Sequence, residues 1–298
     1  MRRAPGDVMN DRPMPRRGWL EVSRGRAFVS HLLASAAIVG GACAIIFFVW
    51  YPHPYFQATG AWTVLRVLIG VDLGLGPLLT LVVFKPGKRG LKFDLVAIAL
   101  VQLAALVYGM TSIYQGRPYF TVFAIDRFYV LARADVDPAE LARRARAQPI
   151  GEKPLRGPLL VAATRPTDPA GMQRLLDETV FRGLPDIERR PDYWRPYAEE
   201  TPRIASHAQP LAVLRAARPA SAEQIAALPA RLGVPEERLG FVPLIARNRD
   251  LSFIVDRTNG APLEVLDVDP WVEDGKAAPG GAAASPEPAP PAAATAQP

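Results

Sequence analysis

The sequence predicts an α-helical membrane protein in which three transmembrane helices precede a small α+β periplasmic domain and a disordered, Ala/Pro-rich tail. Three observations predict this fold class. Apolar residues make up 49% of the 298-residue chain and are concentrated before Tyr114. Residues 115–274 carry short strand and capped-helix patterns, and residues 275–298 are mainly Ala, Pro and Gly. Residues 1–27 are assigned to a basic cytoplasmic arm, and residues 28–114 to the three-helix membrane region.

Three apolar stretches predict the membrane-spanning helices: residues 28–50, 62–84 and 93–114. Each has about 23 residues, which suits a hydrocarbon core about 30 Å thick. A cleaved signal peptide is the alternative for the first stretch, because Ala42-Cys43-Ala44 resembles a cleavage site. A retained helix is favoured, since the apolar run continues past Cys43 to Trp50. Cys43 is the one cysteine in the sequence, so no intramolecular disulfide can form.

The basic residues beside these stretches predict the orientation of the chain, because Lys and Arg in short loops stay on the cytoplasmic side. These topology determinants are Arg24, Arg26, Lys85, Lys88, Arg89 and Lys92. The connection 51–61 has neither Lys nor Arg. The N-terminus is therefore expected in the cytoplasm and the domain after Tyr114 on the opposite side of the membrane. Four aromatic residues are expected as anchors at the outer membrane surface: Trp50, Tyr51, Tyr55 and Trp62.

The net charge of +6 would suggest a nucleic-acid partner if the chain were uniform. It is not uniform. Through Tyr114 there are twelve Lys or Arg residues against five Asp or Glu, whereas the remainder has 23 against 24. The basic character is therefore a topology signal, and no nucleic-acid partner is expected.

Three cap patterns predict helices in the domain. Asp137 and Asp168 are each followed by proline, which supplies an N-cap and a first helical residue. Ser221 with Gln224 forms a capping box. The predicted helices cover residues 138–146, residues 169 to about 183, and a segment that begins after Ser221.

Strand patterns occupy much of the remaining domain. Residues 120–131 are rich in β-branched and aromatic residues and predict a strand or a tight hairpin. The other predicted strands are residues 159–163, 239–245, 251–255 and 263–268. Asn259-Gly260 is a turn pair that joins the last two. Prolines interrupt residues 185–219, which predicts a loop-rich segment; packing onto the domain explains its Tyr193-Trp194 pair better than a contact patch does.

No sequence pattern indicates a catalytic, metal or cofactor site. The histidines, His31, His53 and His207, have no spacing that could hold a metal ion. Gly-x-Ser-x-Gly, Walker and Cys-x-x-Cys motifs are absent from the sequence. Carboxylate pairs such as Glu199-Glu200 are better explained as solvated charge than as acid–base groups. We therefore expect a protein that is not an enzyme, without catalytic residues, metal ligands or cofactors.

Polar residues at membrane depth are the candidate functional residues. Asp72 lies near the middle of the second apolar stretch, where an ionised carboxylate costs about 2.5–3.5 kcal/mol. Gln102 lies at a similar depth in the third stretch and is the best neutral partner. Helix packing and direct binding of a partner are equally good explanations for this pair, and a proton relay ranks third. Arg66 lies one turn inside Trp62 in the second stretch, so its charged side chain can extend to the outer membrane surface.

Small residues surround Asp72 and indicate close helix packing. Gly70, Gly74, Gly76 and Pro77 lie in the second stretch, and Ala36, Gly40 and Ala44 recur at a spacing of four in the first. Such residues let helix backbones approach closely, either inside the bundle or with an incoming helix. Packing inside the bundle is the simpler explanation.

A series of short motifs runs from the end of the first apolar stretch into the domain. The motifs are Trp50-Tyr51-Pro52, Gly70-Val71-Asp72, Gly76-Pro77-Leu78-Leu79-Thr80, Lys85-Pro86-Gly87-Lys88, Leu91-Lys92-Phe93-Asp94-Leu95, Gln102-Leu103, Tyr108-Gly109, Arg117-Pro118, Val122-Phe123 and Asp126-Arg127-Phe128. Together they resemble the type IV pilin accessory proteins of Gram-negative bacteria. The resemblance covers residues 23–132 well and the rest loosely. Residues 1–22 have no counterpart, so a start at Val22 would suit the family.

The resemblance implies a non-enzymatic inner-membrane protein that supports type IV pilin assembly or pilus dynamics in twitching motility and cell adhesion. Its expected partners are the major pilin, other pilus assembly proteins and membrane lipid. Two other classes stay open. An ion-coupled membrane subunit would use Asp72 but would need further ionisable groups at membrane depth. A membrane-anchored periplasmic sensor would need a partner to supply its cytoplasmic output domain.

Overall fold

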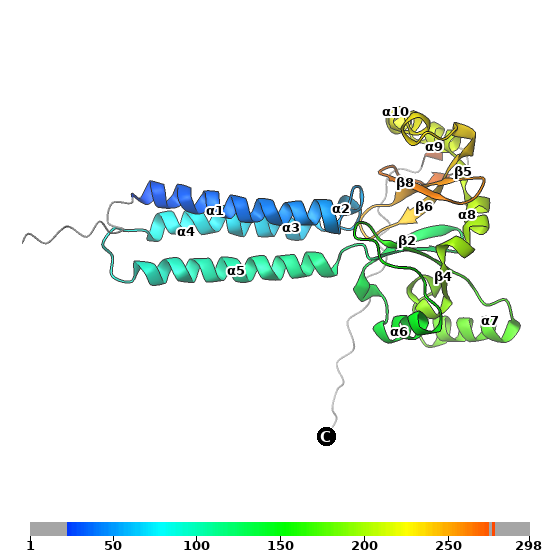
Figure 1. The fold of residues 1–298 in the computed structure, drawn as a ribbon, viewed down its shortest axis with the longest axis horizontal. Coiled ribbons are helices and arrows are strands. Elements are labelled where there is room, and N and C mark those ends of the chain that lie inside the picture. The colour runs from blue at the N-terminus through cyan, green and yellow to red at the C-terminus, as the bar shows by residue number, and fades with distance from the viewer. Residues whose placement is uncertain (1–22, 274–275, 278–298) are drawn as a thin grey trace, which may run out of the picture. The chain divides into compact units, whose positions relative to one another are not determined.

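The computed structural model describes residues 23–273 and 276–277, whose elements are shown in order in Figure 1. The predicted basic arm and disordered tail lie almost entirely outside the described residues. The chain divides into two compact units: Met1–Gly41 with Arg66–Gly109, and Ala42–Leu65 with Met110–Pro298. The first unit consists of parts of three long helices. The second contains the remaining parts of these helices and a β-sheet domain.

Three long apolar helices form at the predicted positions. The first is α1 (Arg24–Ile45) with a π-helical end, Ile46–Trp50; the second joins α3 (Trp62–Ile69), a π-helical segment (Gly70–Leu75) and α4 (Gly76–Val83); the third is α5 (Leu91–Gln115). The most apolar 18-residue windows of these helices have mean hydropathies of 2.5, 1.8 and 2.0, and each helix is long enough to cross a membrane. Pro77 lacks an N–H group, and the wider π-helical turn before it accommodates this loss.

The second unit contains a mixed sheet with the strand order β4-β3-β1-β2-β6-β7-β8, and β5 pairs with β6. The strands are β1 (Phe120–Ala124), β2 (Arg127–Leu131), β3 (Leu159–Ala163), β4 (Trp194–Pro196), β5 (Gln209–Pro210), β6 (Leu239–Ile245), β7 (Leu251–Asp256) and β8 (Pro262–Leu266). The β1–β3 and β2–β6 pairs are parallel, and the other pairs in this sheet are antiparallel. A separate pair joins β9 (Val272–Glu273) to β10 (Lys276–Ala277). The predicted hairpin at residues 120–131 and the other predicted strands are confirmed.

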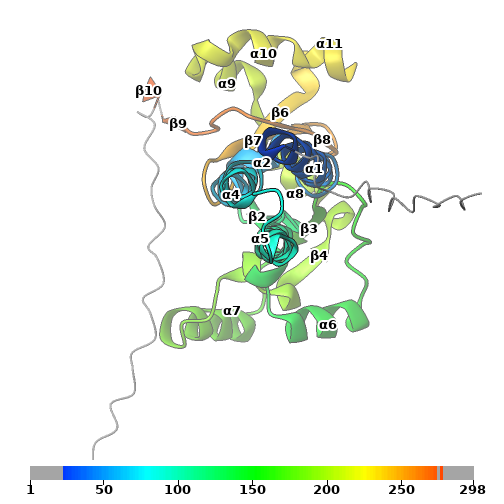
Figure 2. The same ribbon diagram turned by 90° about the vertical axis from the view of Figure 1, so that its left-hand side faces the viewer.

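Helices lie at both ends of this sheet (Figure 2). At one end are α6 (Pro138–Ala147) and α7 (Pro169–Leu176), and at the other are α9 (Leu211–Ala217), α10 (Ala222–Ala226) and α11 (Leu228–Leu232). Between them, α8 (Thr201–His207) packs on the sheet through Ile204. The side chains of Asp137 and Asp168 accept hydrogen bonds of 2.7 Å from the N–H groups of Ala139 and Gly171, so both predicted caps are confirmed. The capping box at Ser221 is wrong, because its side chain makes no capping hydrogen bond.

The segment 185–219 is more ordered than its prolines suggest. It contains β4, α8, β5 and α9, so the prediction of a loop-rich segment is wrong. Prolines are compatible with these elements, since they lie at helix starts and strand ends. Trp194 is fully buried and packs on Phe120 with ring centroids 4.8 Å apart. Packing therefore accounts for Trp194, as the sequence indicated.

The core of the second unit follows the alternation of side chains along the strands. Phe123, Phe128 and Phe253 lie on one face of the sheet, because strand pairing brings residues of the same face together. Phe120 and Phe241 point to the other face. There, β1 and β3 pack with α7, and β6 and β7 pack with α9, α10 and α11.

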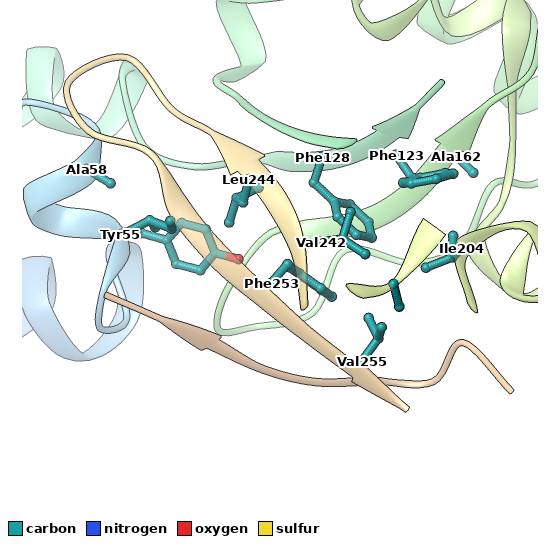
Figure 3. Packing of buried hydrophobic residues seen from close by; sticks show 12 residues of the cluster. Tyr55, Ala58, Phe123, Phe128, Ala162, Ile204, Val242, Leu244, Phe253 and Val255 are labelled. Atoms are coloured by element: carbon teal, nitrogen blue, oxygen red, sulfur yellow. The ribbon is translucent and has the colours of Figure 1, made fainter. Parts of the chain in front are cut away.

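A short helix between the first two long helices completes the first of these cores. Tyr55 and Ala58 belong to α2 (Tyr55–Ala58) and lie among Leu244, Phe253 and other strand residues (Figure 3). The backbone N–H of Asn248, in the β6–β7 turn, donates a 2.8 Å hydrogen bond to the carbonyl of Ala58. Burial raises the pKa of Tyr55 to about 12, so its phenol is neutral. The connection is thus part of the domain core.

The burial of Tyr51 and Tyr55 contradicts their expected role as aromatic anchors at the membrane surface. Tyr51 and Tyr55 are only 2% and 5% exposed, so the expectation that they lie at a membrane surface is wrong. The Tyr51 hydroxyl donates a 2.6 Å hydrogen bond to the carbonyl of Ile113, near the end of α5. Trp62 is 47% exposed and remains compatible with an interfacial position.

A buried polar cluster between the helices

Asp72 lies in the π-helical segment Gly70–Leu75 of the first unit. Its side chain is buried, with the residue 5% exposed, and the Oδ2 atom has no hydrogen-bond partner among the described residues. Segments of π-helix are rare and are frequently found at functional sites. An unpaired buried carboxyl oxygen is energetically costly, so Asp72 is the most conspicuous polar group of this unit.

Gln102 of α5 contacts Asp72, as the sequence suggested. Its Nε2 atom donates a 3.2 Å hydrogen bond to the carbonyl oxygen of Asp72. The hydrogen bond joins α5 to the π-helical segment, and the Oδ2 atom of Asp72 keeps capacity for another partner. Gln102 is itself buried, at 9% exposed.

His31 of α1 connects this pair to the first helix. Its Nε2 atom lies 2.8 Å from Gln102 Oε1, and its Nδ1 atom lies 2.6 Å from Thr80 Oγ1 on α4. Because the amide oxygen only accepts hydrogen bonds, Nε2 carries the proton. In the neutral ring, the Thr80 hydroxyl then donates to Nδ1. The four residues form one hydrogen-bonded cluster that spans all three helices.

His31 and Thr80 belong to this site although the spacing of the histidines does not point to them. For His31 a signal exists in the sequence, because an ionisable residue inside an apolar helix is itself a functional signal. Thr80 gives no such signal, because threonine is common in apolar helices and can bond to its own backbone. In the described part of the chain, no group of three or more His, Cys, Asp or Glu side chains could hold a metal ion.

Gly76 lies against this cluster, whereas Gly70 and Gly74 do not. A Cβ atom at Gly76 would lie 2.0 Å from Gln102 Nε2, so only glycine leaves room for the Gln102 side chain in this position. Pro77 is also buried. At Gly70 and Gly74 an added Cβ would have no neighbour within 4 Å among the described residues. These two glycines therefore present an open helix surface.

The small residues of α1 also lie on an open surface. Ala36, Gly40 and Ala44 are exposed, and buried residues such as Val39 and Ala42 make the contacts of this helix instead. The simpler explanation, that the Ala36–Gly40–Ala44 stripe packs inside the bundle, is therefore wrong for the described chain. Between the second helix and α5 there is in addition a groove of about 200 Å³, lined by Leu75, Leu79, Ile98, Val101 and Gln102 among others.

The predicted topology determinants are all exposed at helix ends. They are Arg24, Arg26, Lys85, Lys88, Arg89 and Lys92. Lys88 forms an ion pair of 2.6 Å with Asp94 in the first turn of α5. This arrangement keeps the positive charges off the apolar helix surfaces.

Comparison with known proteins identifies the family. The profile of the family described as "Fimbrial assembly protein FimB" matches residues 21–60. A fimbrial assembly protein of serogroup E1 from Dichelobacter nodosus is 34% identical over 231 residues, which cover 76% of this chain and 87% of that protein. The chain belongs to the FimB fimbrial assembly family. The serogroup I protein of the same organism is 36% identical over 185 residues, or 61% of this chain and 70% of the relative.

The FimB profile and the polar cluster overlap at one residue. The matched segment runs through α1 and α2 and therefore includes His31, whereas Asp72, Thr80 and Gln102 lie beyond it. No solved structure significantly matches the chain. Family membership agrees with the resemblance to type IV pilin accessory proteins.

Proposed function

We propose that this protein is a non-enzymatic accessory protein of the bacterial inner membrane that supports type IV pilin assembly or pilus dynamics by binding pilin within the membrane. A role in the assembly of fimbriae follows from its family. The finer proposal concerns the partner and the place of contact. Three apolar helices of sufficient length support a membrane location.

The observation that carries the pilin-binding proposal is the open helix surface at Gly70 and Gly74. In lipid the hydrophobic effect does not drive helices together, so association depends on close packing and polar contacts. Small residues permit that approach, and no described residue occupies the space beside these two. The stripe of Ala36, Gly40 and Ala44 offers a second surface of the same kind. The apolar N-terminal helix of pilin is the proposed occupant, while the domain after α5 contacts the pilin head.

Site-specific crosslinking in cells tests this contact. A photocrosslinking residue at Val67, which is 64% exposed and three positions before Gly70, should capture pilin. The double substitution Gly70→Leu and Gly74→Leu should reduce this product about tenfold, because two leucines fill the open surface. Ala104→Leu, at an exposed position of α5, is the matched control and should leave the product unchanged.

Deletion of the gene tests the assembly role itself. We expect fewer surface pili and reduced twitching with near-normal amounts of pilin, because an accessory protein would act on pilin already inserted in the membrane. Wild-type piliation and motility in the deletion strain, together with no pilin crosslink from any of the three helices, would rule out the proposal.

An ion-coupled membrane subunit is the second candidate, and the His31–Asp72 cluster is the observation that favours it. The cluster supplies the further ionisable group at membrane depth that this class of protein requires. It nevertheless contains one carboxylate and one imidazole, and the link between them passes through an amide side chain. Pilin binding remains the preferred function.

A further inference from the structure

Three basic side chains surround Tyr119, directly after the third long helix. The guanidinium carbons of Arg117 and Arg133 lie 5.1 and 5.6 Å from the centre of its ring, and Lys153 Nζ lies 5.5 Å from it. The three residues come from different parts of the second unit: the connection after α5, the turn after β2 and the loop after α6. We call these three residues the basic cluster.

The basic cluster has no carboxylate partner among the described residues. Arg117 donates to the carbonyl of Tyr114 at 2.7 Å, and Lys153 donates to the carbonyls of Pro154 and Gly157 at 2.9 and 2.5 Å. Desolvation and the positive charge of Arg117 both lower the pKa of Lys153, so these two cations repel one another. An anion bound beside Arg117 and Lys153 would relieve this repulsion.

The cluster lies beside the ends of two apolar helices. Arg117 is two residues beyond the end of α5, and its guanidinium stacks 3.6 Å from the Tyr114 ring. The loop with Lys153 reaches the end of the first long helix, because a Cβ at Gly157 would lie 3.9 Å from Pro52. In that loop Leu155 is 84% exposed. Lipid headgroups occupy the level at which such apolar helices end.

We propose that Arg117, Arg133 and Lys153 bind the phosphate group of an anionic phospholipid in the leaflet that faces the sheet domain. Arginine is well suited to phosphate because its N–H groups form a planar fork, and lysine adds a point charge. Leu155 would enter the apolar layer beside the headgroup. Free phosphate offers the same chemistry, but the adjoining helix ends and the exposed leucine favour a lipid. This inference rests on the proposed membrane insertion of the three helices.

Native mass spectrometry of the full-length protein, released from detergent micelles, tests the site. Phosphatidylglycerol should bind in preference to phosphatidylcholine. The triple variant Arg117→Gln, Arg133→Gln and Lys153→Gln should lose affinity for phosphatidylglycerol by about fivefold per cation removed. A matched triple variant, Arg146→Gln, Arg174→Gln and Arg182→Gln, removes three other exposed cations without ion pairs among the described residues and should bind like the wild type.

Two results would overturn the proposal. One is unchanged phosphatidylglycerol binding by the triple variant. The other is binding of inorganic phosphate to the wild type that is as strong as its binding of phosphatidylglycerol at the same concentration. The site would then take a free anion. Arg133→Gln alone keeps the test valid if the triple variant unfolds, since Arg133 is exposed and makes no hydrogen bond in the described structure. Carbonate extraction of cell membranes, done first, separates failure of membrane insertion from failure of lipid binding.

Discussion

The carboxyl group of Asp72 distinguishes the two candidate functions at the scale of a single residue. Its Oδ2 atom is buried without a hydrogen-bond partner among the described residues, and Gln102 donates a hydrogen bond to its backbone carbonyl. If the side chain acts by hydrogen bonding, either to a partner helix or between the helices of the bundle, Asp72→Asn should retain most of the surface pili and Asp72→Leu should lose most of them. Pili counted by electron microscopy at matched protein abundance provide the measurement. Equal loss in both variants would favour a titrating carboxylate and the ion-coupled function.

Gly76 allows a second prediction at this scale. A Cβ at this position would displace the Gln102 side chain, which would then lose its hydrogen bonds to His31 and to the Asp72 carbonyl. Gly76→Ala should therefore cost about 1–3 kcal/mol, because buried polar groups are left unpaired. Gly74→Ala is the control, since its Cβ meets no described atom and alanine favours a helix by about 0.5–1 kcal/mol over glycine. Thermal unfolding in detergent should rank Gly76→Ala lowest, and a stability equal to that of Gly74→Ala would contradict the clash.

Among the elements, α2 has the largest predicted effect on stability. Tyr55 fills the sheet core beside Phe253, so Tyr55→Ala should leave a cavity that costs about 3–5 kcal/mol. For a domain of this size the unfolding temperature should fall by roughly 10 °C. Tyr108→Ala removes a tyrosine that is 76% exposed on α5 and should change the unfolding temperature little. Equal unfolding temperatures for the two variants would show that α2 does not stabilise the domain.

The same element shows why some features could not be predicted from the sequence. Strands such as 159–163 and 239–245 were predictable because β-branched and apolar residues form short runs between turns. Tyr55 was misassigned because an aromatic residue between two apolar helices is typical of a membrane surface. Only the tertiary fold shows that the sheet covers it. In the polar cluster, Asp72 and Gln102 were predictable from their depth in the apolar stretches. The contacts of His31 were not predictable, because Thr80 and Gln102 lie 49 and 71 residues away from it in the sequence.

At the scale of the whole molecule, the distribution of basic residues predicts on which side of the membrane the sheet domain lies. Lys85, Lys88, Arg89 and Lys92 are exposed in the connection before α5 and in its first turn, whereas the connection 51–61 has no Lys or Arg. Basic residues in short loops remain in the cytoplasm. A reporter that is active only outside the cytoplasm should therefore work when fused after Asp274 and fail when fused after Arg89.

A charge-removal variant sharpens this prediction. Substituting Lys85, Lys88, Arg89 and Lys92 with Gln removes the cytoplasmic signal between the second and third helices, while Arg24 and Arg26 remain. Part of the population should then invert its last helix, and reporter activity after Asp274 should fall, because the orientation depends on the balance of basic residues across short loops. The control replaces the exposed residues Arg143 and Arg146 of α6 with Gln and should keep full activity, since they lie well beyond the last apolar helix. Activity after Arg89 with silence after Asp274 in the wild type would reverse the proposed orientation, and the sheet domain could not then meet pilin outside the cytoplasm.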